Sequence, residues 1–187
     1  MNALVPLVVL IPLLSAAAAL VFGRSRTAQR VIAIAALAAV FLIGSALVVL
    51  VDSGPLVMEV GGWQAPFGIV LVVDRLSALM VAVSALVLLA VLIFSVGQGL
   101  ADGDDETPVS IFFPTYLILG AGVFTAFIAG DLFNLYVGFE ILLVASYVLM
   151  TLGGTTERIR AGTTYIVVSL VSSVLFLASI AMIYAAV

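Results

Sequence analysis

The chain of 187 residues is 65% hydrophobic and only 9% charged, whereas about a quarter of the residues of an ordinary soluble domain are charged. This composition excludes a soluble globular domain and predicts an all-α polytopic membrane protein. Histidine and cysteine are absent, and the net charge of −4 comes mainly from one acidic loop, so we expect no disulfide, no metal site, no cofactor and no nucleic-acid partner.

Six apolar stretches are long enough to cross a bilayer, which requires about 20 helical residues. We expect transmembrane helices near 3–23, 30–51, 75–98, 109–129, 132–152 and 162–186. No positive segment precedes the first stretch, and arginines follow it, so we interpret it as a retained span and not as a signal peptide.

The arginines predict the orientation. The loops after the first and fifth spans carry five of the six cationic residues, Arg24, Arg26, Arg30, Arg158 and Arg160. Six alternating spans put both loops on one face, which the positive-inside rule makes cytoplasmic, with both termini extracellular. The acidic loop 98–108 falls on the same face, but acidic residues carry little weight in this rule.

The segment 53–74 differs from the apolar spans because it is rich in glycine and proline. Its runs LVMEV (56–60) and FGIVLVV (67–73) have the composition of short strands. We interpret them as the arms of an external β-hairpin around GGWQAP, with Trp63 near the outer membrane interface. The alternative is an irregular loop.

Glu140 stands near the middle of the fifth span, where charge is costly and usually functional. On a helix its face also carries five apolar or aromatic residues, Phe133, Tyr136, Leu143, Val144 and Tyr147. Tyrosine hydroxyls can hydrogen-bond an acid and hold water beside it, which is the environment that a proton relay needs. The alternative is a structural ion pair, but the chain has no lysine and no arginine at matching depth.

Three further charged residues stand at the ends of spans. Asp131 lies nine residues before Glu140, on the opposite helical face and about 13 Å along the axis. We expect it to cap the fifth span, with access to an outer half-channel as the alternative. Asp74 is expected to cap the third span, and Arg75 is expected to reach the membrane interface.

Hydroxyl residues recur at helical spacing on the sixth span, where one face carries Tyr165, Ser169, Ser172, Phe176 and Ser179. The third span has a similar series, Ser77, Ser84 and Ser95. Such stripes usually indicate close helix packing. The alternative is a hydrated path beside Glu140.

Two sequence segments carry a family resemblance. APFGIVLVVDRLSALM and AGDLFNLYVGFEILLVASYVLMTLGGT resemble the D subunit of Mrp-type multisubunit Na⁺/H⁺ antiporters. More broadly, they resemble the proton-conducting antiporter-like subunits of respiratory complex I (NADH-quinone oxidoreductase) and membrane-bound hydrogenases. The resemblance runs along the whole chain and is most specific at 130–154.

The resemblance implies a larger fold of about fourteen helices, with two inverted five-helix repeats after a three-helix leader. Residues 1–108 then correspond to the leader, with its hairpin and acidic loop, and 109–187 to the first three helices of the first repeat. In this family the acid that matches Glu140 works with a lysine on a broken seventh helix. We therefore expect that lysine-bearing helix in a C-terminal part that is missing from this chain.

The resemblance also implies the function: a secondary-transporter subunit of a bacterial plasma-membrane antiporter, working with other antiporter subunits on protons and a monovalent cation such as Na⁺. Glu140 would relay protons, with possible support from Tyr136, Tyr147, Asp131, Ser169 and Ser172. We expect the chain to be inactive without the missing part and its partner subunits. One alternative is a proton-pumping subunit of a complex I-like oxidoreductase or a hydrogenase, and another is a scaffolding fragment.

Overall fold

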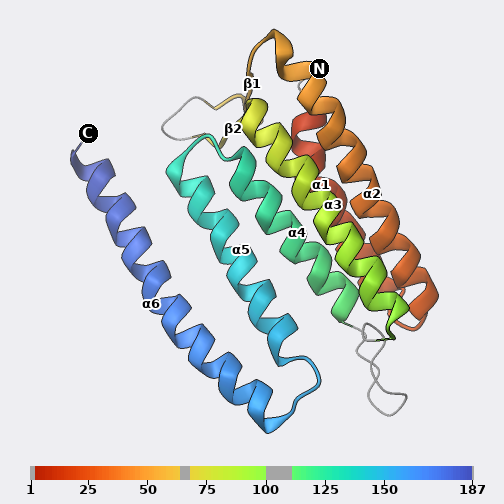
Figure 1. Cartoon of the computed structure of the whole chain (residues 1–187). Helices are drawn as coiled ribbons and strands as arrows, with labels where there is room; N and C mark the ends of the chain where they lie inside the picture. Colours follow the sequence, from red (N-terminus) through yellow and green to blue (C-terminus); the bar gives the residue numbers. More distant parts are fainter. Residues whose placement is uncertain (1–2, 64–67, 100–110, 187) are drawn as a thin grey trace.

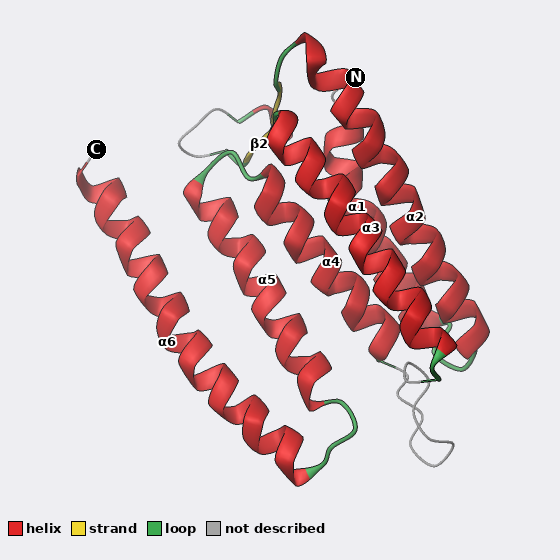
Figure 2. Ribbon diagram, in the orientation of Figure 1, coloured by secondary structure: helices red, strands yellow, loops and turns green. Residues whose placement is uncertain are grey.

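The computed structural model describes residues 3–63, 68–99 and 111–186. In this part of the chain the structure is mostly helical, with two short strands at one end (Figure 2). The helices are α1 Leu4–Val21, α2 Arg26–Leu50, α3 Arg75–Gly97, α4 Phe112–Ile128, α5 Leu132–Thr151 and α6 Thr156–Ala186. All but α4 are long and apolar enough to cross a membrane, and α4 is apolar with 17 residues. The all-α membrane fold is therefore confirmed.

Successive helices run in alternating directions (Figure 1). Both ends of the chain lie at the end of the bundle that carries the strands, which we call the hairpin side. The turns between α1 and α2 and between α5 and α6 lie at the opposite end, which we call the turn side, so the five arginines of these loops share one face. The predicted acidic loop 98–108 falls, from residue 100 on, outside the described residues.

Two helices begin earlier than the apolar pattern predicts, and both have polar first turns. Helix α2 begins at Arg26 instead of 30, and α6 begins at Thr156 instead of 162. Each has a hydroxyl residue before it, Ser25 and Thr155, whose side chain accepts a hydrogen bond of 3.3 Å from the backbone N–H three residues later. Such caps stabilise a helical turn in water without any apolar side chain.

The hydrophobic core is formed by α1, α2, α3, α4 and the strand that precedes α3. Its largest fully buried side chains include Phe113, Phe124, Leu37, Leu47, Leu92 and Leu117. In the described residues, α5 contributes only the partly buried Leu149 to this cluster and α6 contributes nothing. Helix α5 is attached to the core through α4, and α6 packs mainly on α5 (Figure 1).

The predicted β-hairpin is confirmed, with shorter strands than the predicted arms. Strand β1, Leu56–Glu59, pairs antiparallel with β2, Val70–Val73, in the register Leu56 opposite Val73. Trp63, at the end of the first half of the hairpin, is 69% exposed, and its place at the membrane interface stays a prediction. Residues 64–67, which include the end of the GGWQAP turn, lie outside the described residues.

Glycines bring α4 and α5 into backbone contact. A Cβ atom on Gly122 would lie 2.7 Å from the backbone nitrogen of Leu142, and one on Gly138 would lie 2.9 Å from the backbone nitrogen of Ala126. Real Cβ atoms do not come this close to backbone. Small residues allow such approach in membranes, where close packing and not water exclusion holds helices together. The face of α5 toward α4 is therefore fixed by glycine contacts.

Candidate functional site

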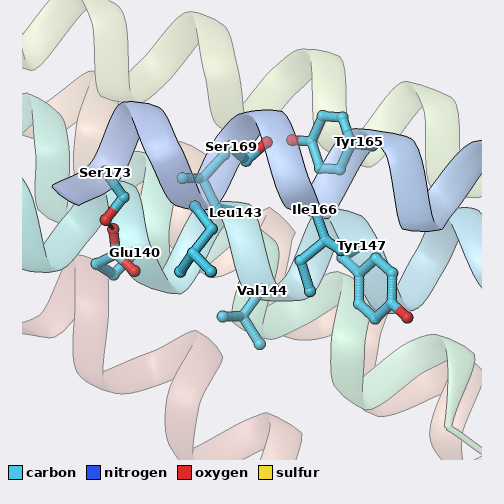
Figure 3. Close-up of a pocket in the computed structure, with 9 residues that line it drawn as sticks. Glu140, Leu143, Val144, Tyr147, Tyr165, Ile166, Ser169 and Ser173 are labelled. Atoms are coloured by element: carbon cyan, nitrogen blue, oxygen red, sulfur yellow. Dashed lines mark hydrogen bonds between the residues drawn. The ribbon is translucent and has the colours of Figure 1, made fainter. Parts of the chain in front are cut away.

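Glu140 lies on the side of α5 that faces α6, and its side chain is half-buried. Ser173 of α6, which is 6% exposed, donates a hydrogen bond to Glu140 Oε1 (Figure 3). The same Ser173 Oγ lies 3.4 Å from the Tyr136 hydroxyl oxygen. We call these three residues the hydroxyl–carboxylate cluster; it joins α5 to α6 near the middle of both helices.

Aromatic rings surround the cluster toward the hairpin side. The Tyr136 ring centroid lies 6.0 Å from that of Phe176 on α6 and 6.3 Å from that of Phe133 on α5. Phe139 meets the same Phe176 ring edge-on at 6.1 Å. Edge-to-face ring pairs favour one relative orientation, so Phe176 helps to fix α6 against the part of α5 that carries Tyr136 and Glu140.

A pocket of about 110 Å³ adjoins the cluster on the turn side (Figure 3). It is lined by Glu140, Leu143, Val144, Tyr147, Tyr165, Ile166, Ser169, Leu170 and Ser173. The structure thus brings the predicted Tyr147 and Ser169 to the same pocket as Glu140. The Tyr147 hydroxyl, however, points away from Glu140 in Figure 3, toward the far end of α5. Of the two flanking tyrosines, only Tyr136 has its hydroxyl linked to the acid, and the link runs through Ser173.

Two more pockets continue along α5 and α6. One of about 380 Å³ is lined by Phe139, Glu140, Leu143, Ser172, Ser173 and Phe176. Another of about 430 Å³ at the hairpin side is lined by Gly68, Ile69, Asp131, Phe133, Leu177, Ile180, Ala181 and Tyr184. Glu140, Leu143 and Ser173 line both of the first two pockets, so both pockets adjoin the cluster.

Asp131 has a structural role that sequence analysis anticipated in part. Its Oδ1 accepts a 2.6 Å hydrogen bond from Asn134 N, which confirms that it caps α5. Its Oδ2 accepts a 3.2 Å bond from Val70 N of β2, and Gly130 N donates to Val70 O at 2.8 Å. The α4–α5 turn is therefore hydrogen-bonded to the hairpin through Asp131, Gly130 and Val70. We call these two contacts the clasp. Asp131 lines the hairpin-side pocket but neither pocket that contains Glu140.

The charges around the start of α3 are also structural. Asp74 caps this helix by accepting a 2.7 Å bond from Ser77 N, as predicted. Hydrogen bonds from the Ser77 backbone and side chain lower the pKa of Asp74. Arg75 pairs with Asp52 at 2.8 Å, a contact that sequence analysis missed. Both side chains are exposed, so this pair contributes little to stability.

Sequence analysis also missed Ser173, the residue that contacts Glu140. It stands four residues after Ser169 and three before Phe176, which are helical spacings on one face, and this was the available signal. Ser172, which was predicted instead, donates 3.0 Å to the Val168 carbonyl of its own helix while lining the second pocket.

The groups that meet Glu140 in the described residues are hydroxyls and apolar side chains, while Arg158 and Arg160 lie at the turn side. No group of three or more His, Cys, Asp or Glu that could hold a metal ion occurs within the described residues. The arrangement is a single carboxylate that contacts a chain of two hydroxyls and lines two pockets. Chemically, it can bind, hold and release a proton.

Comparison with known proteins identifies relatives along almost all of the chain. Residues 129–187 match the family model of NADH:quinone oxidoreductase/Mrp antiporter membrane proteins. The chain is 41% identical over 98% of its length to the D subunit of the Na⁺/H⁺ antiporter of Alkalihalophilus pseudofirmus, and 39% identical over 99% to that of Bacillus subtilis. In both cases it covers 37% of the relative, so it spans a little over a third of their length.

Two solved structures share the fold. One is the Mrp complex from a Dietzia species, with a TM-score of 0.88 at 31% identity, covering 100% of this chain and 35% of that chain. The other is a membrane-bound sulfane sulfur reductase, an archaeal respiratory membrane complex, with a TM-score of 0.87 at 28% identity, covering 99% of this chain and 37% of that chain.

Proposed function

The chain belongs to the family of NADH:quinone oxidoreductase and Mrp antiporter membrane subunits, and on this premise we propose that it serves a monovalent cation/proton antiporter by relaying protons through Glu140. Its relatives are named as the D subunits of Na⁺/H⁺ antiporters. The proposed partners are the other subunits of such an antiporter, and the proposed cargo is protons and a cation such as Na⁺.

The observation that carries this proposal is the contact of Glu140 with Ser173 beside two pockets. A carboxylate in the middle of a membrane helix is costly, and acids retained there commonly belong to proton or ion paths. The Ser173 hydroxyl, which lines both pockets, is a polar partner that could hold water beside the acid, because buried water needs polar partners.

In the proposed cycle, Glu140 takes up a proton from one side and releases it to the other when a nearby positive charge moves. The chain has no lysine, so we propose that the charge is carried by a lysine-bearing helix of the remaining part of the subunit. A cation near Glu140 favours its charged form and drives proton release, and withdrawal of the cation favours proton uptake.

The orientation follows from charge. Five of the six arginines lie at the turn side, so we propose that this side faces the cytoplasm of a bacterial cell and that the hairpin and both ends of the chain face outward. Protons that Glu140 releases toward the hairpin side would then leave the cell, and protons that it takes up from this side would come from outside.

The second candidate function is a subunit of a redox-driven proton translocase. The observation in its favour is the similarity to the archaeal respiratory membrane complex. The same Glu140 chemistry would serve both machines, so subunit composition separates them. Purification of the native complex with small antiporter subunits supports the antiporter, whereas co-purified flavin or iron–sulfur subunits support the redox machine.

The test of the proton relay is Glu140→Gln in the assembled complex, with cation/proton exchange measured in membrane vesicles. We expect exchange to fall by about a hundredfold or more, the loss typical of removing a proton-transfer group, with normal assembly. Glu140→Asp should retain part of the activity because the acid remains on a shorter side chain. Glu157→Gln is the matched control, since Glu157 is an exposed carboxylate at the start of α6. Normal exchange by an assembled Gln variant would disprove the relay.

A further inference from the structure

We propose that Ser173 and Tyr136 form the hairpin-side branch of the proton path, in which the Ser173 hydroxyl takes the proton of Glu140 and passes its own to Tyr136. This inference rests on the proposed function of Glu140. It assigns a role to Ser173, which stands outside the predicted set of site residues, and gives the path a direction. The geometry that carries it is the double contact of one buried hydroxyl.

A serine hydroxyl has one hydrogen and two acceptor lone pairs. Ser173 Oγ lies within hydrogen-bonding distance of both Glu140 and Tyr136. Its single hydrogen can go to one of these partners at a time, and a lone pair can accept a hydrogen from the other. When Glu140 is charged, the hydrogens run from Tyr136 to Ser173 to Glu140. When Glu140 is protonated, its own hydrogen can point at Ser173 and the whole order reverses. The chain of hydroxyls therefore has two states, set by one proton.

The transfer balances at every atom. Glu140 gives its carboxyl proton to Ser173 Oγ, the former hydroxyl proton of Ser173 moves to Tyr136 Oη, and the former phenolic proton leaves for a water molecule on the far side of Tyr136. Each hydroxyl gains one proton and loses one, so neither carries a lasting charge. Rotation of both hydroxyls then restores the starting order.

The branch points to the hairpin side because Tyr136 is one helical turn nearer to the start of α5 than Glu140. The Phe133 ring lies against Tyr136 and also lines the hairpin-side pocket with Asp131 and Tyr184. The hairpin-side pocket and Tyr136 therefore share the Phe133 ring as a neighbour. The opposite pocket, with Tyr165 and Ser169, approaches Glu140 from the turn side.

Two other serines of α6, Ser172 and Ser179, do not offer the same chemistry. The Ser172 and Ser179 hydroxyls donate to carbonyls one turn earlier in their own helix, at 3.0 and 2.8 Å, and both residues are exposed. Ser173 is buried and its hydroxyl leaves the helix to reach α5. Ser179→Ala is therefore the matched control for Ser173→Ala, because it removes a hydroxyl from the same helix without touching the cluster.

The test compares Ser173→Ala, Ser173→Thr and Tyr136→Phe in the assembled complex, with Glu140→Gln measured in parallel. We expect Ser173→Ala and Tyr136→Phe each to reduce exchange by about a hundredfold, the lower end of the range for a missing proton-transfer group. Ser173→Thr should restore most of the exchange because it keeps the hydroxyl. Normal exchange by Ser173→Ala and Tyr136→Phe beside an inactive Glu140→Gln would overturn the branch and leave the relay intact.

Infrared difference spectroscopy supplies a readout that packing alone does not move. The C=O stretching band of the protonated Glu140 carboxyl is identified by its loss in Glu140→Gln. We expect Ser173→Ala to shift this band, because the protonated carboxyl loses the hydroxyl that accepts its O–H hydrogen, and Ser173→Thr to return it. An unshifted band in Ser173→Ala would contradict the contact itself. Normal exchange by Glu140→Gln would instead overturn the proposed function, and the branch with it.

Discussion

The two sides of α5 are built on opposite principles. Toward α4 the contacts are made by glycines, and a Cβ atom on Gly122 or Gly138 would collide with the opposing backbone. Toward α6 the contacts are made by a carboxylate, two hydroxyls and aromatic rings, with pockets between them. The difference shows how a membrane helix can hold a polar group in place. One side is packed without space, so the other can leave space for water and still keep its geometry.

Gly138→Val should have the largest effect on stability, because it disrupts the glycine-packed side of α5 that faces α4. We call this the closed side, and the side that faces α6 the open side. The new Cβ would meet Ala126 N at 2.9 Å, and backbone cannot move aside as a flexible side chain can. We expect a loss of about 3 kcal/mol in stability, at the upper end for overpacking, and poor assembly. Thermal unfolding of the purified complex measures it. Gly97→Val is the control, because within the described residues no atom outside its own stretch of helix lies within 4 Å of its Cβ position. Equal stability of the two variants would contradict the close packing of α5 on α4.

Asp131→Ala should have the next largest effect, because it releases the start of α5. The helix loses its cap and Val70 N loses its acceptor, so we expect a loss of about 2 kcal/mol, about 1 for the cap and about 1 for the other bond. Asp131→Asn retains a cap acceptor and should lose about half as much. Limited proteolysis of the hairpin should quicken in the Ala variant. An unchanged cleavage rate would mean that the clasp does not hold the hairpin.

Gly162→Val tests the open side of α5, where we expect a smaller stability loss of about 1 kcal/mol, the lower range for overpacking. Its Cβ would meet Thr151 Cγ2 at 2.5 Å, and the loosely packed α6 can shift to relieve the contact. We expect exchange to fall severalfold even so, because the shift separates Ser173 from Glu140. Adding Thr151→Ala removes the collision and should restore exchange. Failure of this second change to restore it would argue against the shift.

Asp74→Ala should have the smallest effect on stability. Like Asp131, Asp74 caps a helix, so it provides a comparison for Asp131, which also accepts a hydrogen bond from the hairpin. The folded-state pKa of Asp74 is lowered from 3.8 by Ser77. The cap therefore stabilises the fold fully above pH 3.8, and this stabilisation is lost as pH falls through the lowered pKa. The stability difference between the native chain and Asp74→Ala should be constant from about pH 7 to about pH 5 and shrink below about pH 4. A difference that stays constant to about pH 2 would contradict this role.

The features that could be predicted are those that depend on residues close together in the sequence. The six apolar stretches, the hairpin runs and the Asp131 and Asp74 caps each depend on residues within a few positions, and the structure confirms them. The proton role of Glu140 stays a prediction. The contact of Ser173 with Glu140 was not predicted, because a serine in a helix usually donates to a backbone carbonyl one turn earlier, as Ser172 does. Which serine reaches across depends on how α6 is rotated against α5, and no local pattern encodes that rotation.

The clasp between Asp131 and Val70 has a consequence for the order of folding. The two residues are 61 positions apart, so α3 and α4 must both be in the membrane before the clasp can close, and contacts this distant form late. The hairpin is synthesised before α5, so its contact with Asp131 can form only after the start of α5 has been made. We therefore expect the contact of Asp131 with the hairpin, beside the hairpin-side pocket, to form late in folding.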